Sequence, residues 1–161
     1  MKEGHGVETM SSSMPDRGPL LPIAGHEGHG TDFSDRVLDY GTSPRNYGSL
    51  AVPDGYAKYK GPCGDTVEMF LLVADGRITG ASFRTDGCTP AMAAASAVTV
   101  MVTGKTLWEC VRIDQDAVLA HLGGLPDDSR HCALLAVRTL RRALRSFAKT
   151  RKPGAQPAPP E

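Results

Sequence analysis

The sequence predicts an α+β domain in which helices pack on one face of a small antiparallel sheet. Two strand-like segments around the turn Asp75-Gly76 precede several helix-like segments, and strands followed by helices are typical of this class. The chain has 161 residues and is 40% hydrophobic, which is enough for a single core. Folding therefore requires neither disulfides nor a structural metal.

Composition divides the chain into three parts. Residues 1–31 are rich in Gly, Ser, Pro and His without any periodicity, and we expect a disordered N-terminal tail. Residues 151–161 have a similar composition and predict a disordered C-terminal tail. The folded domain is expected over residues 32–150.

The strongest strand signal is a hairpin over residues 65–87. Val67, Met69 and Leu71 alternate with other residues, and Asp75-Gly76 is a typical hairpin turn. A short helix is expected before it, over residues 31–41, with Thr31 or Asp32 as its N-cap. The segment between this helix and the hairpin is interpreted mainly as loop.

Four helices are expected after the hairpin. The first begins with Thr89 as N-cap and Pro90 at the first helical position, and its small side chains predict close packing on the sheet. Two short helices follow over residues 106–113 and 114–124, the second ended by Gly123-Gly124. The last helix is expected from about residue 128 to residue 149.

Three of the four cysteines lie at boundaries between elements. Cys63 precedes the first hairpin strand and Cys88 follows the second, each 12 residues from the turn pair Asp75-Gly76, so the hairpin returns them to one end of the sheet. Cys132 lies in the first turn of the last helix, where free N–H groups and the helix dipole favour a thiolate.

These cysteines predict a metal site if the last helix begins beside the hairpin ends. Three thiolates joined by the imidazole of His131 or the carboxylate of Asp65 suit tetrahedral iron or zinc. Cys110, within an apolar helix, is instead interpreted as a small core residue.

Two other functions remain open, a thiol enzyme and the structural zinc domain of an interaction protein. A thiol enzyme would use Cys132 with His131 as its base, but helix neighbours point about 100° apart, which disfavours such a dyad. A closed structural zinc site would not need Asp65 beside three thiolates. His121, near a helix C-terminus, is expected to be a structural imidazolium.

The chain resembles the iron–sulfur cluster assembly scaffolds of the IscU type, which also form the N-terminal domain of NifU. The resemblance runs from about Phe33 to Lys149. It is carried by "FSDRVLDYGTSPRNYG", "GPCGD", "FRTDGC", "GKTLWE" and "HCALLA".

The resemblance implies a small α+β scaffold, with a sheet of about three strands, on which a [2Fe–2S] cluster is built and then passed to apo-proteins. A cysteine desulfurase would deliver the sulfur, and zinc is an alternative metal at the site. The implied ligands are Cys63, Cys88 and Cys132, with His131 or Asp65 as the fourth. Such a carrier is not an enzyme. A sister type, a zinc-bound sulfur acceptor that stimulates the desulfurase, is the alternative function.

Charge and hydropathy bear on partners and location. Lys plus Arg and Asp plus Glu each number 18, so we expect neither nucleic acid nor a membrane as partner. No apolar run approaches the length of a membrane span, and residues 1–31 resemble neither a signal peptide nor a transit peptide, so we expect a cytoplasmic protein. The stretch "LPDDS" departs from the family's chaperone-recognition segment, which weakens the expectation of a heat-shock-type chaperone. An arginine stripe on the last helix is either a solvated face or a docking surface for an acidic partner; its members are Arg138, Arg141, Arg142 and Arg145.

Overall fold

The computed structural model describes residues 33–150. The segments expected to be disordered, residues 1–31 and 151–161, lie outside the described residues, as do the expected helix caps Thr31 and Asp32. The first helix, α1 (Asp35–Thr42), is capped instead by Ser34, whose hydroxyl accepts a hydrogen bond from the amide of Val37 at 3.2 Å.

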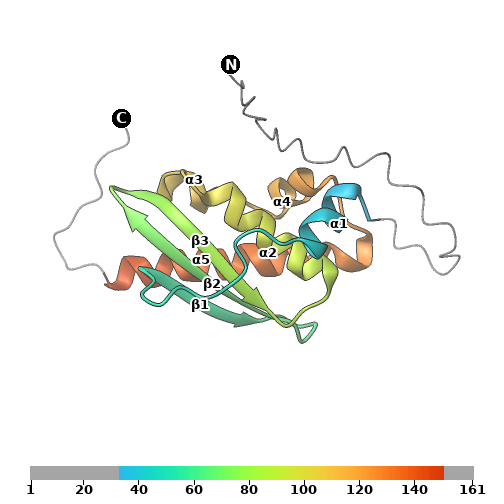
Figure 1. The fold of residues 1–161 in the computed structure, drawn as a ribbon, viewed down its shortest axis with the longest axis horizontal. Helices are drawn as coiled ribbons and strands as arrows, with labels where there is room; N and C mark the ends of the chain where they lie inside the picture. Colours follow the sequence, from blue (N-terminus) through green and yellow to red (C-terminus); the bar gives the residue numbers. More distant parts are fainter. Residues whose placement is uncertain (1–32, 151–161) are drawn as a thin grey trace, which may run out of the picture. The chain divides into compact units, whose positions relative to one another are not determined.

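The sheet has three antiparallel strands in the order β1-β2-β3 (Figure 1). They are β1 (Gly55–Lys60), β2 (Thr66–Ala74) and β3 (Arg77–Thr85). The predicted hairpin is β2–β3, and both residues of its turn, Asp75 and Gly76, have positive φ, as a type I′ turn requires. The sequence did not locate β1, which pairs with β2 along its whole length.

Two long helices cover one face of the sheet (Figure 1). They are α2 (Thr89–Val102) and α5 (Arg130–Thr150), which pack against the strands and against each other. Between them lie α3 (Leu107–Val111), α4 (Gln115–Leu122) and the single 3₁₀ turn η1 (Asp127–Ser129). No helix among residues 33–150 is long and apolar enough to span a membrane.

Two predicted helix starts need correction. Cys88, not Thr89, is the N-cap of α2, and it caps the helix without a side-chain hydrogen bond. The last helix begins at Arg130, because residues 127–129 form the 3₁₀ turn first. Both shifts place chemically reactive residues at the open ends of helices.

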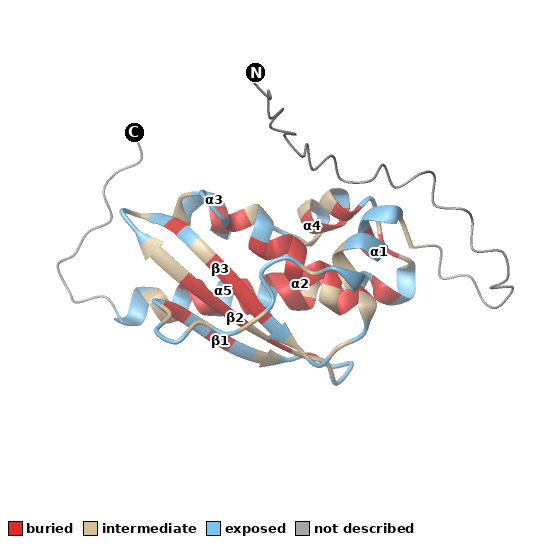
Figure 2. Ribbon diagram, viewed as in Figure 1, coloured by how far each residue is buried: buried red, intermediate tan, exposed pale blue. Residues whose placement is uncertain are grey.

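The core lies between the sheet and the two long helices (Figure 2). Val67, Met69 and Leu71 are fully buried there, as their alternation predicts. Phe70 points to the opposite face and is nevertheless buried, since the ring of Tyr56 lies 5.1 Å from it. Ten of the fourteen residues of α2 are buried, which only a helix of small side chains allows at such close packing.

Candidate metal centre

Three potential metal ligands converge at one end of the sheet. Asp65 lies in the β1–β2 loop, Cys88 ends the β3–α2 loop, and Cys132 occupies the first turn of α5. One ligand atom from each lies within 4.8 Å of the other two, so the hairpin brings Cys88 back to the loop that contains Asp65, two residues after Cys63. The Sγ of Cys88 lies 4.0 Å from Oδ2 of Asp65.

Cys63 lies beside this cluster on an exposed turn. The turn is closed by hydrogen bonds from the amide of Gly64 to the carbonyl of Gly61, at 3.0 Å, and from the amide of Gly61 to Asp65, at 2.9 Å. Gly64 has φ of +93°, a conformation that other residues rarely adopt. Cys63 stands outside the group of three, but its charge is close enough to act on Cys132.

Gly87 permits the close approach of the two loops. A Cβ at this position would lie 2.6 Å from the Cβ of Ala91 and 3.1 Å from Oδ2 of Asp65. Ala91 is almost fully buried and cannot yield easily. The absence of a side chain at Gly87 therefore makes room for the Asp65 carboxylate.

The pKa of Cys132 is raised to about 12 by burial first, then by the negative charges of Cys88, Asp65 and Cys63. The expectation that the helix start favours a thiolate here is therefore wrong for the metal-free chain: burial and three acidic neighbours outweigh the dipole. A cation bound among the same groups would reverse the effect, since it neutralises the repulsion and takes the proton's place. The donor set thus fits a cation.

His131 is exposed at the start of α5, with its Nε2 3.7 Å from the Sγ of Cys132. The two side chains of this pair are therefore in contact, although neighbours on a helix point about 100° apart. His131 does not belong to the group formed by Asp65, Cys88 and Cys132.

Cys110 and His121, both interpreted from the sequence as structural residues, lie outside the metal-ligand cluster. Cys110 is fully buried, and burial raises its pKa to about 11, which makes it an inert thiol. His121 accepts or donates a hydrogen bond with the Tyr40 hydroxyl at 2.9 Å. Burial first, then Arg36, lowers its pKa, so the expected imidazolium is wrong and the neutral ring is favoured.

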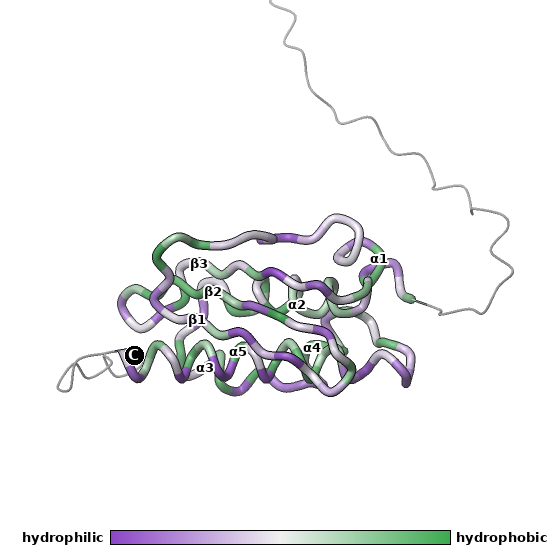
Figure 3. The backbone as a smooth tube through the Cα atoms, turned by 90° about the horizontal axis from the view of Figure 1, so that it is seen from below, coloured by the Kyte–Doolittle hydropathy of each residue, from purple (hydrophilic) through white to green (hydrophobic). Residues whose placement is uncertain are grey.

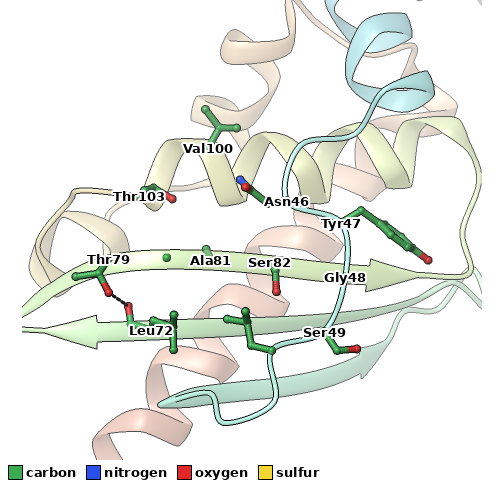
Figure 4. A pocket seen from close by; sticks show the side chains of 12 residues that line it. Asn46, Tyr47, Gly48, Ser49, Leu72, Thr79, Ala81, Ser82, Val100 and Thr103 are labelled. Atoms are coloured by element: carbon green, nitrogen blue, oxygen red, sulfur yellow. Dashed lines mark hydrogen bonds between the residues drawn. The ribbon is translucent and has the colours of Figure 1, made fainter.

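The structure also has a hollow of about 630 Å³, which lies against β3 under the loop after α1 (Figure 4). Asn46, Tyr47, Leu72 and Val100 are among its lining residues. The Ser82 hydroxyl is buried there without a hydrogen-bond partner in the described part of the chain. This hollow has no acid, base or thiol in its lining, in contrast to the cluster at the end of the sheet.

An antiparallel three-stranded sheet with helices on one face defines a small α+β domain, and a Cys/Asp cluster of a kind that could hold a metal ion lies at its end. The chain matches the family described as NifU-like N terminal domain over residues 32–153, and it belongs to that family. The resemblance found in the sequence is thereby confirmed.

The names of similar proteins agree with this family assignment. The chain is 42% identical over 113 residues to "Iron-sulfur cluster assembly scaffold protein IscU 1" of Archaeoglobus fulgidus, covering 70% of this chain and 74% of that protein. It is 32% identical over 119 residues to "Iron-sulfur cluster assembly scaffold protein IscU" of Aquifex aeolicus, covering 72% and 76%. The crystal structure of a NifU-like N-terminal protein from Brucella abortus matches with a TM-score of 0.63 at 22% identity, covering 73% of this chain and 95% of that one. This structural match confirms the α+β fold.

Proposed function

We propose that this chain is a scaffold on which a [2Fe–2S] cluster is assembled from iron and desulfurase-derived sulfur and then transferred to apo-proteins. The observation that carries the proposal is the convergence of Asp65, Cys88 and Cys132 within 4.8 Å at an accessible end of the domain. Family membership and the scaffold names of the relatives support it. The scaffold domain corresponds to residues 32–150.

The cluster is the cargo, and its ligands are Cys63, Cys88, Cys132 and either Asp65 or His131. Cys132 is buried and gives a fixed thiolate once metal displaces its proton, whereas Cys63 and Cys88 are exposed. An incoming acceptor thiol therefore reaches the exposed side of the cluster first. Asp65, a harder oxygen ligand than a thiolate, keeps the fourth bond exchangeable.

The proposed role is that of a carrier, not of an enzyme. Its partners are a cysteine desulfurase as sulfur donor and apo iron–sulfur proteins as acceptors. The four free thiols suit a reducing cytoplasm. The contact between His131 and Cys132 supports the imidazole as a replaceable neighbour of the site, rather than as the base of a thiol enzyme, because burial and acidic neighbours keep Cys132 protonated.

Cluster transfer tests the proposal. The protein is purified without oxygen, loaded with iron, cysteine and a desulfurase, and mixed with an apo-ferredoxin while visible absorption is followed. We expect slower transfer from Asp65→Ala than from wild type, because an exchangeable ligand is gone, and unchanged transfer from Asp127→Ala, an exposed acid on η1. Equal rates for Asp65→Ala and wild type would remove Asp65 from the mechanism.

Zinc binding gives the second candidate function. The same mixture of thiolates and a carboxylate suits zinc, and a zinc-bound sulfur acceptor would stimulate a desulfurase without building a cluster. Tightly held zinc, with no cluster formed under any loading condition, would replace the scaffold proposal by this one.

A further inference from the structure

The two edges of the sheet differ. The outer edge of β3 is covered at both ends: the Phe83 amide donates to Asn46 at 3.0 Å, and the Ile78 amide donates to Lys105 at 2.9 Å. The outer edge of β1 pairs with no strand among residues 33–150. Unpaired strand edges attract other extended chains unless something blocks them.

The register shows which backbone groups of β1 point outward. The amide of Gly61 donates to Asp65 at the end of the β1–β2 ladder, and hydrogen-bonded pairs alternate along an antiparallel ladder. Tyr59 and Ala57 therefore bond to β2, whereas the N–H and C=O groups of Tyr56, Lys58 and Lys60 point away from it. These are the groups that an added strand would use.

A basic groove of about 660 Å³ runs beside this edge. It is lined by Lys58 of β1 and by Arg142, Arg145 and Lys149 of α5, with no acidic residue. The sole ion pair among the described residues, Arg45–Asp39, lies elsewhere, so the three cations of α5 form no ion pair in the described part of the chain, whereas Lys58 lies across from Glu68 on β2. The Arg142 guanidinium lies 4.2 Å from the centre of the Tyr59 ring, which holds it at the groove.

The cations of α5 lie along the path that an extended chain beside β1 would take. Gly61 lies against Leu135 and Gly55 against Ala143, so α5 and β1 run side by side in opposite directions (Figure 3). Arg142 and Lys149 are separated by about 10 Å along the helix. Alternate residues of a strand are about 6.7 Å apart, so three acidic side chains on one face of an added strand extend over about 13 Å, which is long enough to pass both cations.

We propose that the β1 edge and this groove bind an acidic extended segment of a partner protein as a fourth strand. Its backbone pairs with Tyr56, Lys58 and Lys60, and its carboxylates meet Arg142, Arg145 and Lys149. A second copy of this chain is a poor occupant, because edge-to-edge pairing of β1 would set like charges against each other. Arg145 is about 20 Å along α5 from Cys132, so the segment leaves the candidate metal centre free.

A peptide-binding experiment tests the proposal with the full chain. The probe is a fluorescent peptide of about ten residues that alternates Glu and Val, and its anisotropy reports binding. We expect saturable binding that weakens with salt, and about tenfold weaker binding to Arg145→Glu. Arg138→Glu is the matched control, because it makes the same charge change on the same helix outside the groove lining and is expected to bind as wild type does.

Two backbone-methylated peptides distinguish strand addition from simple charge attraction. One carries N-methyl groups on its Glu residues and the other on its Val residues. In an added strand only one of the two sets of amides faces β1, so one methylated peptide should bind and the other should not. Equal affinities for the two, or equally tight binding of an oligothymidine of similar length, would overturn the proposal.

The result of the peptide experiment does not depend on whether the chain assembles a cluster. A chain that builds a cluster but ignores the peptide refutes only the groove proposal, and the reverse result refutes only the scaffold proposal. Sedimentation that shows a dimer dissociated by Lys58→Glu would instead make a second copy the occupant and overturn the acidic-partner assignment.

Discussion

Gly87→Ala is expected to damage the candidate metal centre through sterics alone. The new methyl group would lie 2.6 Å from the Cβ of Ala91, against an ordinary carbon–carbon contact of about 3.5–4.0 Å. Ala91 is nearly fully buried on α2, so the β3–α2 loop has to move by about 1 Å instead, and this displaces Cys88 relative to Asp65. Overpacking of this kind costs about 1–3 kcal/mol.

The assay is competition for Zn²⁺ with a chromophoric chelator, alongside urea unfolding. Loss of ligand positioning is expected to weaken zinc binding about 10–100-fold. Gly76→Ala is the control: its φ of +74° strains an alanine in the hairpin turn, but nothing lies within 4 Å of its Cβ. We expect lower stability with unchanged zinc affinity for the control. Wild-type zinc affinity in Gly87→Ala would refute the reasoning.

Three further expectations concern side-chain chemistry. Iodoacetamide should modify the exposed Cys63 and Cys88 quickly and the buried Cys132 only on unfolding, as mass spectrometry of the digest would show; rapid labelling of Cys132 contradicts its burial. Because the folded pKa of His121 is lowered, the unfolded chain binds the proton first as the pH falls through about 6.5. The free energy of unfolding should therefore decrease as the pH falls from about 6.5 to the folded pKa of His121. In urea titrations over the same pH range, the His121→Gln variant should lose less of this free energy than wild type does. Ser82→Ala should leave stability unchanged or raise it in thermal unfolding, because the hydroxyl it removes is buried without a partner; a marked loss would reveal a bond to that hydroxyl.

Local sequence signals predicted the elements whose pattern is strong. The β2–β3 hairpin follows from alternating apolar residues and the Asp75-Gly76 turn, and both strands lie where the pattern places them. The strand β1 was not located, because only Ala57 and Gly55 are buried and aromatic residues occur on both of its faces. This segment forms a strand because it pairs with β2, and the sequence pattern of the segment alone carries no information about that pairing.

The convergence of Cys88 and Cys132 at one end of the sheet was predictable as far as chain topology determines it. Equal hairpin arms bring Cys88 to the Asp65 loop, and the position of Cys132 at a helix start completes the cluster. The protonation state of Cys132 was not predictable, because it depends on how deeply that thiol is buried and on how many acidic groups surround it. Only one side of the basic groove could be predicted. The sequence shows the arginine stripe of the last helix, whereas the unpaired edge of β1, which forms the other side of the groove, is known only from the fold.

The most direct test of the scaffold role is anaerobic cluster reconstitution on single cysteine variants. Iron, acid-labile sulfide and the visible spectrum are measured for alanine variants of Cys63, Cys88, Cys132 and Cys110. Cys110 and Cys132 are both buried, so Cys110→Ala is a matched control for the cavity that the substitution leaves. We predict that only Cys110→Ala retains a [2Fe–2S] spectrum like that of wild type. A wild-type cluster on Cys88→Ala or Cys132→Ala would contradict the account.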